Sequence, residues 1–470
     1  MKDKYKKILL ISLDTFRLDG IRDANVNFFN YSLSKKIKPS QLDLFLKKSC
    51  FFSNTISVAP YTAASHAAYF TGRYPKNNGI YDHYNSKLKV DTIFRNAKKH
   101  GFETYFKTDF PLILGKHLNF TKDVDFYFSE NTNYAFEKFN KSKKAFGFFH
   151  FGNIHIPYGF QSLSVSGSAY KNKVFELEKK YNLTFDKRNF TDVAVEIIRS
   201  EEDLNLLYRY KNIVNYLFDN QLYEEILDLY AEGINFFNEH IFNDFLKEVM
   251  NRADKNNWLV ILFSDHGENW NNISYGHFNS SEDECLRVPL LLYGKNIPSK
   301  TILSRIRTID LFPTLNELVF NDEIEVDGIS LLSLIYSDKS HDNRDAFSGI
   351  WINEMKDIST NLSDVINKDN LDTTKSRSIK YCACYFYKNM KCVIWYHKFL
   401  HGAKKLQEVN EINLFEYNKY GKLIPIDNSN KLIIEICKEK IEELNVSEEI
   451  NETFIKNELK EYMRMLGYGV

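Results

Sequence analysis

Three nearly continuous apolar runs stand out along the chain: KKILLISLD (residues 6–14), AFGFFHFGN (145–153) and WLVILFSDHGE (258–268). Runs of this kind predict strands that are covered on both faces, as in a mostly parallel α/β sheet. Each run ends in polar residues, at Asp14, at 153–155 and at Asp265 with His266. Because ligands of open α/β sheets bind at the carboxyl ends of the strands, the pattern predicts one shared crevice.

The segment PYTAASHAAYFTGRYPKNNGI (residues 60–80) predicts a short helix that starts at Thr62 or Ala63 and ends at Gly72. A helix start offers unpaired N–H groups and a positive dipole end, which together favour an anion. Thr62 stands at this start. The segment alone leaves two interpretations open, a capping residue and a nucleophile.

The rest of the pattern predicts two domains. A catalytic α/β domain is expected over residues 1–340, with helices on both faces of its sheet and a helical insertion at about 160–250. A polar linker follows residue 335. The C-terminal subdomain (345–470) is expected to be a small α+β unit, with an antiparallel hairpin at about 378–399 and a charged amphipathic helix from about 430.

Composition excludes several classes of function. Lys plus Arg equals Asp plus Glu at 62 each, so no net charge directs the chain to nucleic acid or a membrane surface. The first apolar run, ILLISL, is short, ends at Asp14 and lacks a cleavage site, so we interpret it as a strand rather than a signal peptide. No run reaches the length that spans a bilayer. We therefore expect a cytoplasmic protein, and the six scattered cysteines are expected to be reduced thiols.

Candidate chemistry gathers at the predicted crevice. Asp14, Asp265 and His266 offer two carboxylates and an imidazole, ligands that suit Zn²⁺, Mn²⁺ or, with fewer nitrogens, Ca²⁺ or Mg²⁺. Charged groups are seldom buried without a partner, which favours a metal site over strand-end caps. His155 and His277 follow nearby, where an imidazole could bind an anionic oxygen or protonate a leaving group. Whether these histidines bind a second metal is left open.

Seven segments, in order, resemble the sulfatase and alkaline phosphatase superfamily. They are ILLISLDTFRLDG, APYTAASHAAYFTGRYPKNNGI, GFETYFKTDF, GFFHFGNIHIPYG, YAEGINFFNEHIFNDFL, FSDHGENWNNISYGHFNSSEDECLRVPLLLYG and the late group TIDLFPTL, VDGISLL and NLFEYNK. The resemblance implies an alkaline phosphatase-like fold, a metal held by Asp14, Thr62, Asp265 and His266, and Thr62 as nucleophile.

Departures from the sulfatase pattern narrow the expected chemistry. Sulfatases begin the second segment with a Cys or Ser that is oxidised to formylglycine, followed by Pro and Arg; here Thr62, Ala64 and His66 occupy these positions. Thr cannot become formylglycine, and the superfamily branches that use a Thr nucleophile act on phosphorus. Thr15 stands where many sulfatases carry a second Asp, which implies fewer carboxylates.

Further residues are candidates for contact with the substrate. Lys107, in YFKTDF, resembles the catalytic lysine by its strand position, although GKH at 115–117 resembles the same motif by letters. His66 and Arg73 are substrate-binding candidates; Arg73 in TGRYP could instead brace the helix. With His155 and His277, Lys107 is expected to stabilise phosphoryl charge while Thr62 forms a covalent intermediate.

The leading hypothesis is a metal-dependent hydrolase or transferase of phosphate mono- or diesters. One alternative is a sulfuric ester hydrolase that works without formylglycine, and another is a non-catalytic member of the family. The expected substrate is a small-molecule or glycan phosphoester or sulfate ester. The sequence identifies neither the leaving group nor the oligomeric state.

Overall fold

The computed structural model describes residues 5–33, 35–81, 86–111, 113–129, 131–155, 158, 168–184, 201–270, 276–277, 280–337, 343–350, 377–401 and 404–445. At its centre lies β1 (Lys7–Leu13), whose seven residues are all buried. It pairs in parallel with β5 (Ala145–Phe151) on one side and β6 (Trp258–Ser264) on the other. The three apolar runs are therefore adjacent strands, and their polar ends meet at one edge of the sheet.

The larger sheet has the strand order β4-β3-β5-β1-β6-β7-β2-β8, and β9 also pairs with β2. Among the strands that the structure describes in this sheet, β7 alone runs antiparallel to its neighbours. The remaining strands are β2 (Cys50–Ile56), β3 (Glu103–Lys107), β4 (Phe126–Phe128), β7 (Arg287–Gly294), β8 (Lys300–Ile302) and β9 (Ile306–Arg307).

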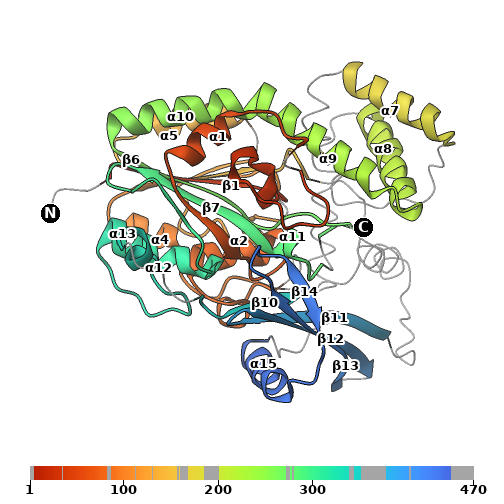
Figure 1. The fold of residues 1–470 in the computed structure, drawn as a ribbon. Helices are drawn as coiled ribbons and strands as arrows, with labels where there is room; N and C mark the ends of the chain where they lie inside the picture. Colours follow the sequence, from red (N-terminus) through yellow and green to blue (C-terminus); the bar gives the residue numbers. More distant parts are fainter. Residues whose placement is uncertain are drawn as a thin grey trace.

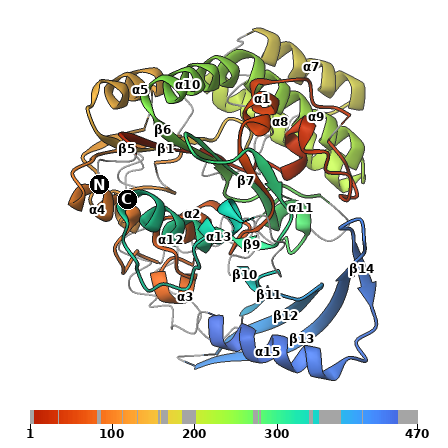
Figure 2. The ribbon, with the colours of Figure 1, turned by 60° about the vertical axis from the view of Figure 1, so that its left-hand side comes forward.

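Helices cover both faces of this sheet (Figures 1 and 2). One face carries α1 (Gln41–Lys47), α5 (Thr132–Lys141), α9 (Tyr223–Phe237) and α10 (Asn243–Asn256). The other face carries α2 (Thr62–Thr71), α4 (Ile93–Lys99), α12 (Leu311–Leu315) and α13 (Leu332–Tyr336). Two more helices, α7 (Ser168–Tyr181) and α8 (Glu201–Asp219), lie at the periphery beside α9, within the range expected for a helical insertion.

A second, antiparallel sheet with the order β10-β11-β12-β13-β14 forms the C-terminal part (Figure 1). Its strands are β10 (Ala346–Ile350), β11 (Arg377–Tyr387), β12 (Met390–His401), β13 (Lys404–Tyr417) and β14 (Leu423–Ile426). The helix α15 (Lys431–Leu444) packs on β11 and β12. Apolar residues of β10, β11 and β12 form a cluster with Ile56 and Leu286 of the larger domain.

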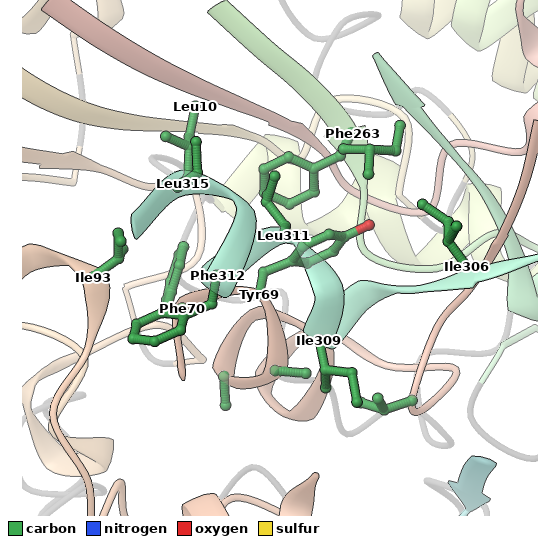
Figure 3. Close-up of a cluster of buried hydrophobic side chains, with 14 of the residues drawn as sticks. Leu10, Tyr69, Phe70, Ile93, Phe263, Ile306, Ile309, Leu311, Phe312 and Leu315 are labelled. Carbon is green, nitrogen blue, oxygen red and sulfur yellow. The ribbon is translucent and has the colours of Figure 1, made fainter. Parts of the chain in front are cut away.

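The helix α2 is buried along its whole length, because all ten of its residues are inaccessible or nearly so. Figure 3 shows its aromatic residues Tyr69 and Phe70 among side chains of the sheet and of the segment around α12. The Tyr69 ring lies 4.1 Å from the ring of Phe263, centroid to centroid. The helix ends at Gly72, whose φ of 67° is a left-handed conformation that glycine adopts readily. These contacts fix the position of Thr62 at the other end.

The expected fold class is confirmed: a large, mostly parallel sheet with helices on both faces is joined to a small antiparallel sheet. The predicted hairpin corresponds to β11 and β12, and the predicted terminal helix to α15. The division at about residue 340 stays a prediction. Within the described ranges, none of the helices combines the length and the apolar character that crossing a membrane requires.

Candidate active site and metal centre

The carboxyl ends of β1 and β6 and the start of α2 bring four side chains together. Asp14 follows β1, Asp265 and His266 follow β6, and Thr62 is the first residue of α2. All four are buried. The Thr62 hydroxyl donates to Asp14 Oδ2 at 3.2 Å, and the same hydroxyl oxygen lies 3.4 Å from His266 Nε2.

The structure does not support Thr62 as a helix cap. Tyr61 occupies the N-cap position, and within the described chain no side chain caps this helix start. The Thr62 hydroxyl is instead directed to the carboxylate and imidazole groups of the sheet edge.

Two carboxylate oxygens in this cluster are buried and have no hydrogen-bond partner among the described residues, Asp14 Oδ1 and Asp265 Oδ2. They lie 3.8 and 3.4 Å, respectively, from His266 Nε2. The other nitrogen of this ring, Nδ1, must carry a proton, because it lies 3.0 Å from the carbonyl oxygen of Gly267, which can only accept. The lone pair of His266 Nε2 therefore faces two carboxylate oxygens.

This arrangement of acceptors fits a divalent cation. Asp14, Asp265 and His266 place their ligand atoms within 4.8 Å of one another, and Thr62 Oγ1 supplies a fourth. One nitrogen and three oxygens match the donors that transition metals such as zinc accept. A cation would also remove the cost of burying two acceptor oxygens without donors.

A second triad, His66, His150 and Asp265, has equally close ligand atoms. Its ring nitrogens are hydrogen-bonded, however. His66 Nδ1 donates to the carbonyl oxygen of Thr62 at 2.8 Å, and His66 Nε2 accepts from the Ser12 hydroxyl at 2.8 Å. His150 Nε2 lies 2.9 Å from Asp14 Oδ2. This triad therefore fits a metal less well than the first.

Burial controls the protonation of the cluster. It raises the pKa of Asp265 to about 7, with the charge of Asp14 as the second cause. It also raises the pKa of Asp14. Burial lowers the pKa of His266 to about 4 and that of His66 to about 3. These two imidazoles are neutral near pH 7, which is the form that binds metals.

His155 and His277 join the cluster from two loops. The His277 ring lies 4.3 Å from the His266 ring and 5.0 Å from the His155 ring, centroid to centroid. His277 Nδ1 is 3.2 Å from Glu268 Oε2. Burial raises the pKa of Glu268 to about 7. The structure thus brings together the five predicted strand-end and loop residues Asp14, Asp265, His266, His155 and His277.

Three other predicted residues have different surroundings. Lys107 is buried at the end of β3, where its Nζ donates to Asp109 Oδ1 at 2.6 Å and to the His150 carbonyl at 2.9 Å. His66 lies one turn inside α2, with both ring nitrogens bonded as described above. Arg73 lies beyond the opposite end of α2, where its guanidinium donates to the carbonyl oxygen of Glu325 at 2.8 Å. The structure does not bring Arg73 to the cluster.

The sequence analysis did not identify His150, Asp109 or Glu268. His150 stands inside the apolar run FFHFG, and a polar residue in a strand that is buried on both faces was the available signal. Glu268 follows the Asp-His pair in the motif DHGE. Both residues are fully buried.

Comparisons with known proteins identify a family and a set of similar folds. The sulfatase family model matches residues 6–320. No curated protein sequence matches the chain significantly. A phosphonate monoester hydrolase from Silicibacter pomeroyi is similar in structure, with 14% identity, 93% of this chain and 94% of that chain covered, and a TM-score of 0.55. The phosphonate monoester hydrolase of Agrobacterium radiobacter is also similar in structure. The identity is 13%, the match covers 93% of this chain and 95% of that chain, and the TM-score is 0.57.

A third similar structure was solved with its substrate D-glucosamine-2-N,6-O-disulfate. Its identity to this chain is 13%, the coverage is 94% of this chain and 98% of that chain, and the TM-score is 0.59. At such identities these likenesses concern the fold alone, while the family model covers about two thirds of the sequence. The chain therefore belongs to the sulfatase family.

Proposed function

We propose that the protein is a metal-dependent hydrolase or transferase of phosphoesters, with Thr62 as the nucleophile. One observation carries the proposal: the Thr62 hydroxyl lies at a helix start, 3.2 Å from Asp14 Oδ2 and 3.4 Å from His266 Nε2, beside two carboxylate oxygens for which the described part of the chain offers no donor. A hydroxyl in such a place is suited to nucleophilic catalysis.

The cation would be held by Asp14, Asp265, His266 and Thr62. When bound, such an ion lowers the pKa of a ligating hydroxyl and offsets negative charge on a phosphoryl group. The imidazole ligand favours zinc or manganese over calcium, which prefers oxygen ligands only.

The chain's own groups account for the remaining steps. Thr62 Oγ1 forms a bond to phosphorus while the bond from phosphorus to the leaving oxygen breaks, and the Thr62 proton passes to Asp14 Oδ2, which accepts its hydrogen bond. His155 provides the proton that the leaving oxygen takes up; His277 is neutral, because burial lowers its pKa to about 3. Water, or the hydroxyl of an acceptor, then attacks the phospho-threonine and gives its proton to His155, while Thr62 Oγ1 takes back its proton from Asp14. The unpaired N–H groups in the first turn of α2 can donate to the phosphoryl oxygens.

The substrate class follows from Thr62 and the relatives together. The printed names of similar structures include phosphonate monoester hydrolases and a protein with a disulfated glucosamine substrate. From these names we infer that the substrate of this chain is an ester of a small molecule or a glycan. Thr62 favours phosphorus, because a threonine cannot be converted to formylglycine. A sulfate ester is the alternative that the experiment must test.

The test is a panel of chromogenic esters: a phosphate monoester, a phosphate diester, a phosphonate monoester and a sulfate ester, each assayed with Zn²⁺, Mn²⁺ and Ca²⁺. We expect turnover of at least one phosphorus ester with Zn²⁺ or Mn²⁺, and its loss in Thr62→Ala. Thr71→Ala is the matched control, because Thr71 lies at the other end of α2 and donates to the carbonyl of Ala67. Preferred turnover of the sulfate ester would contradict the substrate assignment.

A further inference from the structure

His150 contacts the candidate metal centre from inside the apolar strand β5 and was not singled out from the sequence. It is a β5 residue, opposite Ser12 of β1 in the parallel register, and it is completely buried. Its Nε2 lies 2.9 Å from Asp14 Oδ2. This is the same carboxylate oxygen that accepts the Thr62 hydroxyl at 3.2 Å.

The surroundings of His150 decide which ring nitrogen carries the proton. The backbone N–H of Asp109 is directed to Nδ1 at 3.4 Å, and the Thr108 hydroxyl oxygen lies 3.3 Å from the same nitrogen. A backbone N–H can only donate, so Nδ1 is the acceptor. Neutral imidazole then carries its proton on Nε2, and His150 donates to Asp14 Oδ2.

From this hydrogen bond we infer that His150 is a positioning residue for the metal ligand Asp14. Oδ2 of Asp14 accepts two hydrogen bonds, from His150 and Thr62, whereas Oδ1 has no donor among the described residues and lies 3.8 Å from His266 Nε2. His150 therefore restricts Asp14 to one ligand oxygen, Oδ1, and keeps Oδ2 for the Thr62 hydroxyl. The inference rests on the metal centre of the proposed function.

Hydrogen bonds of Lys107 and Asp109, here called the brace, hold His150 in this orientation. Lys107 Nζ donates both to the His150 carbonyl at 2.9 Å and to Asp109 Oδ1 at 2.6 Å. The other oxygen of Asp109 accepts from the backbone N–H of Gly152 at 2.9 Å. The brace joins the end of β3 to the end of β5, so that the N–H of Asp109 stays directed to the His150 ring. Outer hydrogen bonds of this kind orient metal ligands and tune the affinity of the site.

The test compares metal-stripped wild type, His150→Gln, His150→Asn and His150→Phe. Zn²⁺ affinity is measured by competition with a chromophoric chelator, and the coordination of Co²⁺ in place of Zn²⁺ by its visible absorption. A Gln amide can place an N–H near the position of Nε2, whereas the Asn amide is too short and Phe has no donor.

We expect His150→Phe and His150→Asn to bind Zn²⁺ about 10 to 100 times more weakly than wild type. Their Co²⁺ absorption should weaken, because a freed Asp14 can bind through both oxygens and raise the coordination number. His150→Gln should stay close to wild type in both measurements. His100→Phe is a control at a histidine that pairs with Asp322 far along the chain from the cluster.

Equal Zn²⁺ affinity and equal Co²⁺ spectra in Asn and Gln variants would overturn the inference, and this comparison holds even if the Phe variant fails to fold. A wild-type protein that binds neither ion would instead overturn the metal centre itself, together with the inference.

Discussion

At the scale of single residues, each of the two carboxylates of the cluster accepts hydrogen bonds with one oxygen, while its other oxygen has no donor among the residues that the structure describes. Asp265 Oδ1 accepts from the backbone N–H groups of Thr15 at 3.3 Å and His266 at 2.9 Å, while Asp14 Oδ2 accepts from His150 and Thr62. The two remaining oxygens face His266 Nε2. The chain therefore orients its ligands before any cation binds.

Metal affinity should depend on pH through Asp265. Burial, followed by the charge of Asp14, raises the pKa of Asp265 to about 7 in the metal-free protein, so below pH 7 a proton competes with the cation. We expect Zn²⁺ affinity to fall by up to about tenfold per pH unit as the pH decreases from 7 to 6, and to fall less between 8 and 7. Competition with a chelator between pH 6 and 8 measures the Zn²⁺ affinity. An affinity independent of pH would contradict the assignment of Asp265 as a metal ligand.

Thr15 should influence which metal the site prefers. Its φ of 56° is left-handed, which is unusual for a β-branched residue, and its buried hydroxyl has no hydrogen-bond partner among the described residues. Asp tolerates this backbone conformation better than Thr. Thr15→Asp adds a carboxylate beside Asp14, so Ca²⁺ affinity should rise relative to Zn²⁺ affinity in calorimetric titrations. Thr15→Asn is the neutral control and should leave the ratio unchanged.

At the scale of elements, the position of Thr62, the proposed nucleophile, depends on the packing of α2. Tyr69 donates to the carbonyl of Ser264 at 3.0 Å, and the Phe70 ring lies 4.9 Å from the Phe148 ring. These contacts attach the helix to β5 and β6, the strands that carry His150 and precede Asp265. Figure 3 shows Tyr69 of the helix beside Phe263 of β6. Movement of α2 would therefore separate Thr62 from its carboxylate partner.

Gly72, where α2 ends, offers a direct test of this dependence. A Cβ at this position would lie 2.9 Å from Phe312 Cδ1, and φ is 67°. Gly72→Ala should lower the free energy of unfolding by about 1 to 2 kcal/mol for the backbone conformation and by about 1 to 3 kcal/mol more for the contact. Gly101→Ala is the control. Its φ is 76°, but apart from its chain neighbours no atom of the described residues would lie within 4 Å of a Cβ at this position. Urea unfolding measures both variants. Equal losses of unfolding free energy in Gly72→Ala and Gly101→Ala would contradict a contribution from the contact with Phe312.

The elements that the sequence predicted well are those with a strong local signal. β1, β5 and β6 are buried on both faces and thus appear as continuous apolar runs, and Gly72 marks the end of α2. The order of the strands has no such signal, because β1 pairs with strands more than a hundred residues away. His150 was missed for the same reason: its partner Asp14 is a neighbour only across the sheet.

At the scale of the whole molecule, the smaller sheet supports the active-site segment of the larger domain. The Gly349 N–H donates to the carbonyl of Val58 at 2.9 Å, and the Ser348 hydroxyl donates to the carbonyl of Ser57. Ser57 also donates to the carbonyl of Asp265 at 2.7 Å. β10 is thus linked through Ser57 to Asp265 of the candidate metal centre.

A buried ion pair makes a second connection between the smaller sheet and the larger domain. Lys391 of β12 donates to Asp283 Oδ1 at 2.7 Å, and both side chains are buried. Lys391→Met leaves a buried carboxylate without this partner and should lower the free energy of unfolding by about 3 to 5 kcal/mol. The double variant Lys391→Met with Asp283→Leu should recover part of the loss. A double variant as unstable as the sum of the two single variants would contradict direct coupling.

The most direct test of the central claim is to trap the covalent intermediate on Thr62. Zinc-loaded protein is mixed with an activated aryl phosphate monoester, quenched in acid and digested, and the peptide that contains Thr62 is analysed by mass spectrometry. We predict a phosphoryl group on Thr62 in wild type and in Thr71→Ala, and none on the corresponding peptide of Thr62→Ala, which should not turn over the ester. Unmodified Thr62 during turnover, with undiminished activity of Thr62→Ala, would contradict the assignment of Thr62 as the nucleophile.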